Sequence, residues 1–284
     1  MITHTREFIT PEIAKSYLNT SRGNRPLSKA TVNMYVREIL SGHFLETHQG
    51  IAFDENGHLC DGHHRLKAIV LANKGISIDV ARGLPREAIV YLDNGLTRST
   101  ANAMHFAGIY SDNPILHNNE TLATVRQFAY LGTGSTSLYK LGNDEIFALL
   151  ETFEDELRTI YYATTTRPGV VTTGAMRAAA LAALVNGESE KDIFNFFDVY
   201  GNSVPTDNPN KNSIVVLNWR QQMLMARAKH SAFSRTTVYL GTQNAIWNYC
   251  NGTNSRVLRM TEEPRYPAKN IIIDALQNAK EEDK

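Results

Sequence analysis

The side chains best suited to chemistry lie together in one short segment, residues 60–65, which reads Cys-Asp-Gly-His-His-Arg. An apolar stretch precedes this segment, and a helix-like run over residues 66–72 follows it. A glycine where a strand turns into a helix lets backbone N–H groups converge on an anion, and the helix start adds partial positive charge. The carboxylate of Asp61 suits Mg²⁺ and the guanidinium of Arg65 suits phosphate. The segment therefore predicts a site for a phosphate-bearing ligand, with Mg²⁺ held through Asp61.

Two adjacent histidines follow the glycine, and imidazole groups can move protons near neutral pH. Adjacent side chains on a helix diverge by about 100°, so a zinc ion shared by both histidines is not expected. Phosphoryl transfer would also need a group that orients or deprotonates the acceptor. Glu38 is a candidate for that role, and a solvated helix glutamate is its alternative. The predicted catalytic residues are Asp61, His63, His64 and Glu38.

A simpler interpretation of the segment is structural, in which Asp61 caps the following helix and Arg65 makes a surface ion pair. Two histidines and an arginine inside one turn favour a functional site over this alternative. Arg98 follows a predicted strand end and is expected to reach the same pocket. A surface pair with Asp93 is the alternative for Arg98.

Composition indicates a globular protein, because 42% of the 284 residues are hydrophobic and 20% are charged. Two cysteines, Cys60 and Cys250, are too few for a disulfide framework, so a reducing compartment is expected. The first residues carry no apolar signal segment. No apolar run approaches the roughly 20 residues that span a bilayer. These features predict a cytoplasmic protein without a membrane partner.

The net charge is zero, with 29 basic and 29 acidic residues, but the two signs are separated along the chain. No Asp or Glu occurs from residue 208 to residue 261, a stretch that contains both Trp219 and Trp247. Basic residues interleaved with aromatic residues suit nucleic acid, although helical spacing favours the core for any single ring. The predicted nucleic-acid-binding residues, with DNA as the expected partner, are Arg220, Arg227, Lys229 and Arg235.

The pattern of elements predicts an α+β protein with a mixed domain over residues 1–110 and an α-helical domain over residues 111–284. Thr10 before Pro11 predicts one helix start, and Ser28 predicts a second helix that ends near Gly42. Strands are expected at residues 50–53, 76–81 and 88–92, and a further helix is expected to start at Ser99 or Thr100. Helices of the second domain are expected at residues 118–131, 144–163, 170–185, 190–200, 213–229, 236–250 and 270–278.

The turn resembles that of the ParB/sulfiredoxin-like fold. The resemblance is carried by Asp-Gly-His-His-Arg at a helix start and by Asn-Arg-Pro-Leu upstream, at residues 24–27. The whole chain is similar to phage and prophage ParB-like proteins, through Asp-Asn-Gly-Leu-Thr-Arg at residues 93–98 and Ala-Ile-Trp-Asn at residues 245–248. The resemblance covers residues 8–110 and extends more loosely into the helical half.

Members of this fold place a Gly-x-x-Arg turn at the phosphates of a bound nucleotide, so the resemblance implies a nucleoside triphosphate, ATP or CTP, with Mg²⁺. Free-serine kinases of the fold carry the same five letters, Asp-Gly-His-His-Arg. Sulfiredoxins have a reactive cysteine where this chain has His63, which argues against reductase activity. The ParB partition proteins have Glu-Arg-Arg after the glycine, which argues against partition clamping here. With Arg25 added from the resemblance alone, the predicted phosphate-binding residues are Gly62, His64, Arg65, Arg25 and Arg98.

Three functions fit these observations. The first is a phage-type ParB-like protein that binds a nucleotide at residues 61–65 and acts on or with DNA, by hydrolysis of the triphosphate, nuclease chemistry or DNA modification. The second is a small-molecule or nucleoside kinase of the same fold. The third is a non-catalytic protein that binds nucleotide and DNA. A phage-encoded chain would work in the host cytoplasm, and a homo-oligomer is left open.

Overall fold

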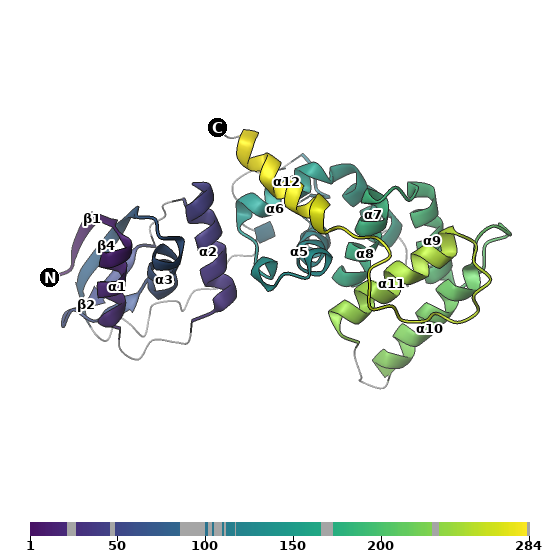
Figure 1. The fold of residues 1–284 in the computed structure, drawn as a ribbon, viewed down its shortest axis with the longest axis horizontal. Coiled ribbons are helices and arrows are strands. Elements are labelled where there is room, and N and C mark those ends of the chain that lie inside the picture. Colours follow the sequence, from purple (N-terminus) through teal and green to yellow (C-terminus); the bar gives the residue numbers. More distant parts are fainter. Residues whose placement is uncertain are drawn as a thin grey trace. The chain divides into compact units, whose positions relative to one another are not determined.

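The computed structural model describes residues 1–21, 27–45, 49–85, 100–101, 104, 110, 112–116, 118–165, 173–228 and 233–282. Contacts within the chain divide it into two compact units. The N-terminal unit comprises Met1–Arg98 and Lys140–Asp144, and the helical unit comprises Ser99–Tyr139 and Glu145–Lys284. The described elements confirm the predicted α+β class, with a mixed sheet and helices first and a largely helical region after it (Figure 1).

The N-terminal unit contains a four-stranded mixed sheet with the strand order β1-β4-β2-β3. Strands β1 and β4 are antiparallel, β2 and β4 are parallel, and β2 and β3 are antiparallel. Helix α3 forms most of the crossover between the parallel strands, as such a connection requires. The elements of this unit are, in chain order, β1 (Thr3–Ile9), α1 (Pro11–Asn19), α2 (Lys29–Ser41), β2 (Ile51–Asp54), β3 (Leu59–Asp61), α3 (His63–Ala72) and β4 (Ile76–Leu84).

The core of this unit lies between the sheet and its three helices, which Figure 1 shows beside the strands. In β4, Ile78 and Val80 are buried while Ser77 and Asp79 are exposed, so at this strand one face packs against the core. Both predicted helix caps are confirmed, because Thr10 accepts a hydrogen bond from the amide of Ile13 at the start of α1 and Ser28 accepts one from Thr31 at the start of α2. Sequence patterning thus located these helices through local chemistry.

Helices α2 and α3 pack against each other and run in the same direction. At their starts, the backbone amide of Ser28 donates to His64 Nε2 over 3.0 Å. At their ends, Lys74 Nζ donates to the carbonyl of Ile39 over 3.1 Å. The start of α2 is therefore held beside the start of α3.

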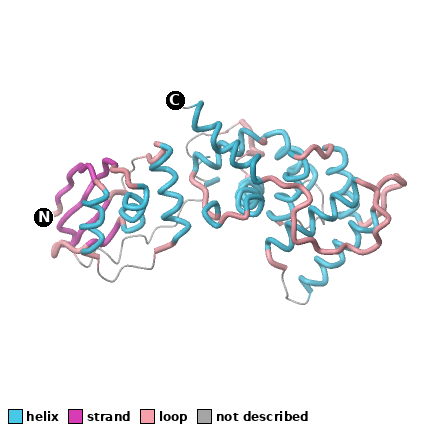
Figure 2. Tube along the Cα trace, viewed as in Figure 1, coloured by secondary structure: helices cyan, strands magenta, loops and turns pink. Residues whose placement is uncertain are grey.

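The helical unit is built around α8 (Gly174–Val185), which is buried on almost every side. A helix that is apolar all round is expected at the centre of a bundle, and α8 packs against α5, α7, α9 and α11. Figure 2 shows how helices dominate this unit. Its described elements, besides a 3₁₀ turn at Thr136–Leu138, are α5 (Asn119–Thr133), α6 (Asn143–Thr152), α7 (Glu154–Thr165), α8, α9 (Glu190–Asn202), α10 (Ser213–Ala228), α11 (Arg235–Cys250) and α12 (Lys269–Glu282).

One predicted helix needs correction, and two strands were not predicted. The single helix expected at residues 144–163 is two helices that meet at Phe153, and three acidic residues, Glu154 to Glu156, mark the start of the second one. Strand β1 was missed because its side chains are almost all exposed, and β3 was missed because it has only three residues. The strand expected at residues 88–92 lies outside the described residues, as do most residues of the helix expected after Thr100.

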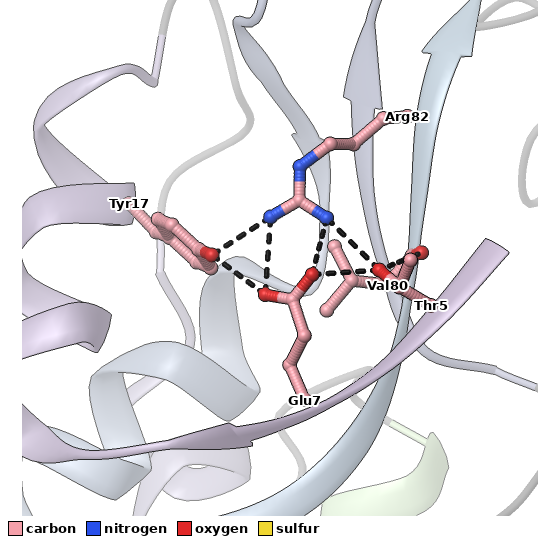
Figure 3. Close-up of polar contacts among 5 residues, drawn as sticks. All are labelled: Thr5, Glu7, Tyr17, Val80 and Arg82. Carbon is pink, nitrogen blue, oxygen red and sulfur yellow. Dashed lines mark hydrogen bonds and ion pairs between the residues drawn. The ribbon is translucent and has the colours of Figure 1, made fainter. Parts of the chain in front are cut away.

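A polar cluster ties β1, β4 and α1 together (Figure 3). The Arg82 guanidinium donates through Nη1 and Nη2 to the two carboxylate oxygens of Glu7, and its Nη2 also donates to the Tyr17 hydroxyl over 2.7 Å. Tyr17 and Thr5 in turn donate their hydroxyl protons to Glu7 over 2.7 Å and 2.6 Å. The same guanidinium lies over the rings of Tyr17 and Phe53. The hydrogen bond from Arg82 is the main cause that lowers the pKa of Glu7 to about 2.

We expect acid to weaken this unit through Glu7. The ordinary pKa of 4.5 falls to about 2 in the folded state, so the stabilisation is complete above pH 4.5 and is lost as the pH falls from there through 2. The loss should amount to about 1–3 kcal/mol of unfolding free energy, since one pKa unit corresponds to about 1.4 kcal/mol and the group is partly exposed. Urea unfolding of the wild type and of Glu7→Gln across this pH range measures it. Glu55→Gln, at an exposed position in the β2–β3 turn, is the control, and an equal acid sensitivity of wild type and Glu7→Gln would contradict the assignment.

Candidate functional site at the β3–α3 turn

Gly62 makes the turn from β3 into α3 in a conformation that other residues rarely adopt. Its φ is 95° and its ψ is 7°, which is the left-handed region. A Cβ atom at this position would lie 2.9 Å from Cγ1 and 3.1 Å from Cα of Ile51. Glycine is therefore required twice over, by its backbone angles and by the close approach of the turn to β2.

The start of α3 leaves its first amides without an intrahelical acceptor. Helical hydrogen bonding begins with the amide of Leu66, which donates to the carbonyl of Gly62 over 2.9 Å, so the three preceding amides point out of the helix start. Gly62 has no side chain with which to cap them, and no side-chain cap is formed. Such a helix start attracts an anion through its N–H groups and its dipole.

The side chain of Arg65 links the turn to the residue that precedes β2. Its Nη2 donates to the carbonyl of Gly50 over 2.5 Å and to Asp61 Oδ2 over 3.2 Å. The other oxygen of Asp61 accepts a 2.6 Å hydrogen bond from the amide of Gly62. The Arg65 side chain is only 11% exposed, and its Nε is buried with no partner among the described residues. Only the Nη1 end of the guanidinium is left to meet a ligand.

Asp61 therefore has a structural role that the sequence did not reveal. Both of its carboxylate oxygens already accept hydrogen bonds, one from Gly62 and one from Arg65. A metal ion at Asp61 would have to share this carboxylate with a guanidinium, and Mg²⁺ and Arg⁺ repel each other. The predicted metal role of Asp61 stays a prediction, and the ion pair with Arg65 weakens it.

The two histidines of the turn have different surroundings. His64 Nε2 accepts the hydrogen bond from the amide of Ser28, whereas Nδ1 of His63 is buried without a partner among the described residues. Burial lowers the pKa of His63, and the positive charge of Lys67 lowers it further. Within the described parts of the chain, no three metal-ligating side chains gather at this turn.

Glu38 lies away from the turn. It is ten residues after Ser28, so it lies about 15 Å along α2 from the end that meets His64. A Cβ atom at Gly142 would be 2.7 Å from Glu38 Oε1, which places this carboxylate beside the 140–144 segment. The structure places Glu38 away from the start of α3, and its role as a base stays a prediction that this separation does not favour. Arg25 and Arg98, the two other predicted phosphate ligands, lie outside the described residues.

In the helical unit, three of the aromatic residues of the acid-free stretch are core residues, as their spacing indicated, whereas Phe233 is exposed and Trp247 is partly buried. Trp219, Tyr239 and Tyr249 are buried, and Trp219 Nε1 donates to Thr242 Oγ1 over 3.0 Å. The guanidinium of Arg265 lies over the ring of Trp247, with its Cζ 4.4 Å from the ring centroid. Base stacking is thus not available to the buried rings.

The predicted basic residues of this stretch are more accessible. Arg227 and Arg235 are exposed, Arg220 is half-buried, and Lys229 lies outside the described residues. Lys211 is already paired, since its Nζ lies 2.7 Å from Asp192 Oδ1. The exposed arginines are therefore the part of the predicted DNA surface that the structure leaves available.

An acidic cluster in the helical unit was not found from the sequence. The side chains of Glu188, Asp192 and Cys250 place one ligand atom each within 4.8 Å of one another. Lys211 supplies a positive charge to Asp192, and the Tyr266 hydroxyl donates to Glu188 over 2.8 Å. Burial, followed by the charge of Glu188, raises the pKa of the Cys250 thiol. Only Glu188 and Asp192 are close in sequence, at helical spacing, so no sequence pattern could have joined Cys250 to them.

Comparison of the chain with protein-family models, with curated proteins and with solved structures finds no match. The resemblance to the ParB/sulfiredoxin-like fold therefore stays a prediction, and the case for a function rests on the geometry of the turn. None of the described helices is long and apolar enough to cross a lipid bilayer.

Replacement of Gly62 by alanine should destabilise the N-terminal unit more than the same change at Gly57. Both glycines have a positive φ, 95° and 77°, which costs alanine about 1 kcal/mol. A Cβ atom at Gly62 would also clash with Ile51, whereas a Cβ atom at Gly57 would meet nothing within 4 Å. We expect Gly62→Ala to cost a further 1–3 kcal/mol or so through overpacking against Ile51, as measured by hydrogen exchange of the β2 and α3 amides. Equal losses in the two variants would show that the close packing is unimportant.

Proposed function

We propose that this protein binds the phosphate groups of a nucleotide at the β3–α3 turn. The observation that carries the proposal is the left-handed Gly62, which has no side chain to cap the start of α3 and lies in the same turn as His64 and Arg65. Backbone amides at a helix start are a general means of binding phosphate. The ligand that fits the sequence resemblance is a nucleoside triphosphate, ATP or CTP, with Mg²⁺.

The charges around the turn support an anion. The one carboxylate within the segment, Asp61, is paired with Arg65, so it repels an incoming phosphate less than a free carboxylate would. Arg65 is fixed by two acceptors, which means that little side-chain entropy is lost when its free end meets a ligand. These features favour a preformed site.

Binding is better supported than catalysis. Glu38 lies along α2 from the turn, and Asp61 is occupied by Arg65 and Gly62. His63 has a lowered pKa, so it is more often neutral at physiological pH, but its Nδ1 is buried. Hydrolysis, nuclease chemistry and kinase activity therefore remain alternatives that require a group from outside the described residues or a movement of the turn.

A carboxylate placed at the helix start should displace the phosphate. We expect ATP or CTP with Mg²⁺ to stabilise the wild type and His63→Gln, by about 2.7 kcal/mol at 100 times the dissociation constant. In His63→Glu the carboxylate competes for the same amides and the same dipole, so affinity should fall at least tenfold while the fold is kept. Thermal unfolding with a nucleotide series measures this.

Two results would count against the site. Equal stabilisation of His63→Glu and His63→Gln would place the nucleotide elsewhere on the chain. No stabilisation of the wild type by any nucleotide, with or without Mg²⁺, would refute nucleotide binding as the function.

We propose DNA contact by the helical unit as a second function, because Arg227 and Arg235 are exposed within a stretch that contains no acidic residue. Phosphate neutralisation by such arginines gives affinity that falls steeply with salt. Contacts from these arginines to phosphate would carry no sequence information, so they fit binding that does not depend on the DNA sequence.

If Arg227 and Arg235 contact DNA, they should determine how steeply the affinity for DNA falls with salt concentration. In the double variant Arg227→Gln/Arg235→Gln, the slope of log affinity against log salt should fall by about 2, since each phosphate contact contributes about 0.9. Fluorescence anisotropy with a duplex at several salt concentrations provides the slopes. Arg158→Gln is the control, because Arg158 is paired with Glu154 outside the acid-free stretch. A slope that is unchanged in the double variant would remove these residues from the DNA surface.

A further inference from the structure

Helix α10 packs against the helical unit with one of its faces. Val215, Val216 and Trp219 are buried, and α10 packs chiefly against α9 and α11. Figure 1 shows α10 at the edge of this unit. Because successive residues of a helix are rotated by about 100°, these three side chains lie on one side of α10. The opposite side of the helix is the outer face.

The outer face of α10 is apolar as well. Ile214 and Met225 are each 52% exposed and Leu224 is 44% exposed, while Leu217 is partly exposed and Ala228 is exposed. A helix that is apolar all round is expected in the middle of a bundle, whereas α10 lies at the edge of one. Neighbouring apolar side chains at a protein surface are typical of an interaction site.

These residues have the spacing of a coiled-coil seam. Ile214, Leu217, Leu224 and Ala228 fall on the a and d positions of a heptad repeat. Gln221 occupies the a position between them, and a polar residue at a single a position fixes the register of paired helices. Together these five residues form the α10 seam. It extends about 21 Å along the helix, at about 1.5 Å per residue, which suits a partner helix of about four turns.

The charges beside the α10 seam are positive. Arg220 and Arg227 occupy its two g positions, along one edge. At the other edge, the side-chain amide of Asn218 donates to the carbonyl of Arg256, an exposed residue. The stretch from residue 208 to residue 261 has no Asp or Glu. The surroundings of the seam therefore complement a negatively charged partner.

We propose that the α10 seam binds an amphipathic helix of another protein, one that carries Glu or Asp on both sides of its own apolar stripe. Residues at e and g positions form ion pairs between paired helices and determine which partners they accept. Carboxylates at those positions of the partner would pair with Arg220 and Arg227. This interaction is separate from nucleotide binding at the β3–α3 turn, which lies in the other unit.

A second copy of this chain fits the seam less well. Antiparallel pairing of two α10 helices would bring Arg220 of one copy towards Arg227 of the other, and like charges across an interface repel. Parallel pairing would place each arginine against the e positions, Asn218 and Met225, neither of which is charged. The seam therefore favours an acidic helix over a copy of itself.

Two synthetic peptides of about three heptads test the proposal. Both have Leu at every a and d position, and one has Glu at every e and g position where the other has Lys. Repulsion between like charges keeps each peptide from pairing with itself. We expect the full-length protein to bind the Glu peptide at least tenfold more tightly than the Lys peptide, as measured by fluorescence anisotropy. No binding of the Glu peptide, or equal binding of the two, would overturn the proposal.

Substitutions in α10 locate the binding. Leu224→Gln/Met225→Gln changes exposed positions, so the fold is kept, and affinity for the Glu peptide should fall at least tenfold through the loss of apolar contact. Arg220→Glu/Arg227→Glu should reverse the preference and favour the Lys peptide. Leu40→Gln, at a 58% exposed position in α2, is the control and should bind as the wild type does. Unchanged binding in Leu224→Gln/Met225→Gln would overturn the proposal.

Two measurements on Leu224→Gln/Met225→Gln distinguish other occupants of the seam. Binding of a DNA duplex depends on charge, so it should be the same in this variant as in the wild type. An equal loss of DNA and peptide affinity would overturn the assignment of the seam to a protein partner. Sedimentation equilibrium gives the oligomeric state, which we expect the variant to leave unchanged. A wild-type dimer that becomes a monomer in the variant would show that the seam joins two copies, and would overturn the proposal.

Discussion

The close approach of Gly62 to Ile51 is the constraint on which the candidate site depends. A left-handed residue without a Cβ lets the chain leave β3, pass against the backbone of β2 and enter α3 within one peptide. Because of that path, the first amides of α3 open at the end of the strands and Arg65 reaches back to the carbonyl of Gly50. A bulkier residue would clash with Ile51 and would move the helix start away from its present position.

Two arginines of the N-terminal unit differ in how many of their guanidinium nitrogens are already hydrogen-bonded. Arg82 uses both of its Nη atoms on Glu7 and Tyr17, and it lies over two aromatic rings. Its contacts hold the edge of the sheet to α1. Arg65 uses Nη2 for its structural contacts, which leaves part of the guanidinium for another partner. The difference is one of remaining hydrogen-bonding capacity.

The sequence predicted most helices of the fold because their signals are local. Thr10 and Ser28 accept the capping hydrogen bonds expected of them, and apolar spacing located the helices of the second half to within a few residues. The pairing of strands is not a local property, so the exposed β1 and the short β3 were not predicted. The boundary at Phe153 was missed because a buried residue continues the helical periodicity across it.

At the candidate site, the sequence identified the turn but not the roles of its residues. Asp61 was expected to hold a cation, which stays a prediction, and the structure shows its carboxylate accepting hydrogen bonds from Gly62 and Arg65. Glu38 was expected near the turn, but its place was decided by the direction in which α2 packs on α3. Ser28 was expected only as a cap, since nothing in a linear pattern could show that its amide meets His64. The ligand chemistry suggested by the residue types stays a prediction, while the hydrogen-bond partners of each group could be found only from the fold.

The common direction of α2 and α3 has an electrostatic consequence. Each helix carries roughly half a positive elementary charge at its start, and the contact between Ser28 and His64 brings these two starts together. Two parallel dipoles that lie side by side repel each other, so this arrangement costs energy in the empty protein. An anion between the two starts would turn that repulsion into a shared attraction, and its departure would restore it. Because the two helices are parallel, an anion between their starts would stabilise the N-terminal unit relative to the empty protein.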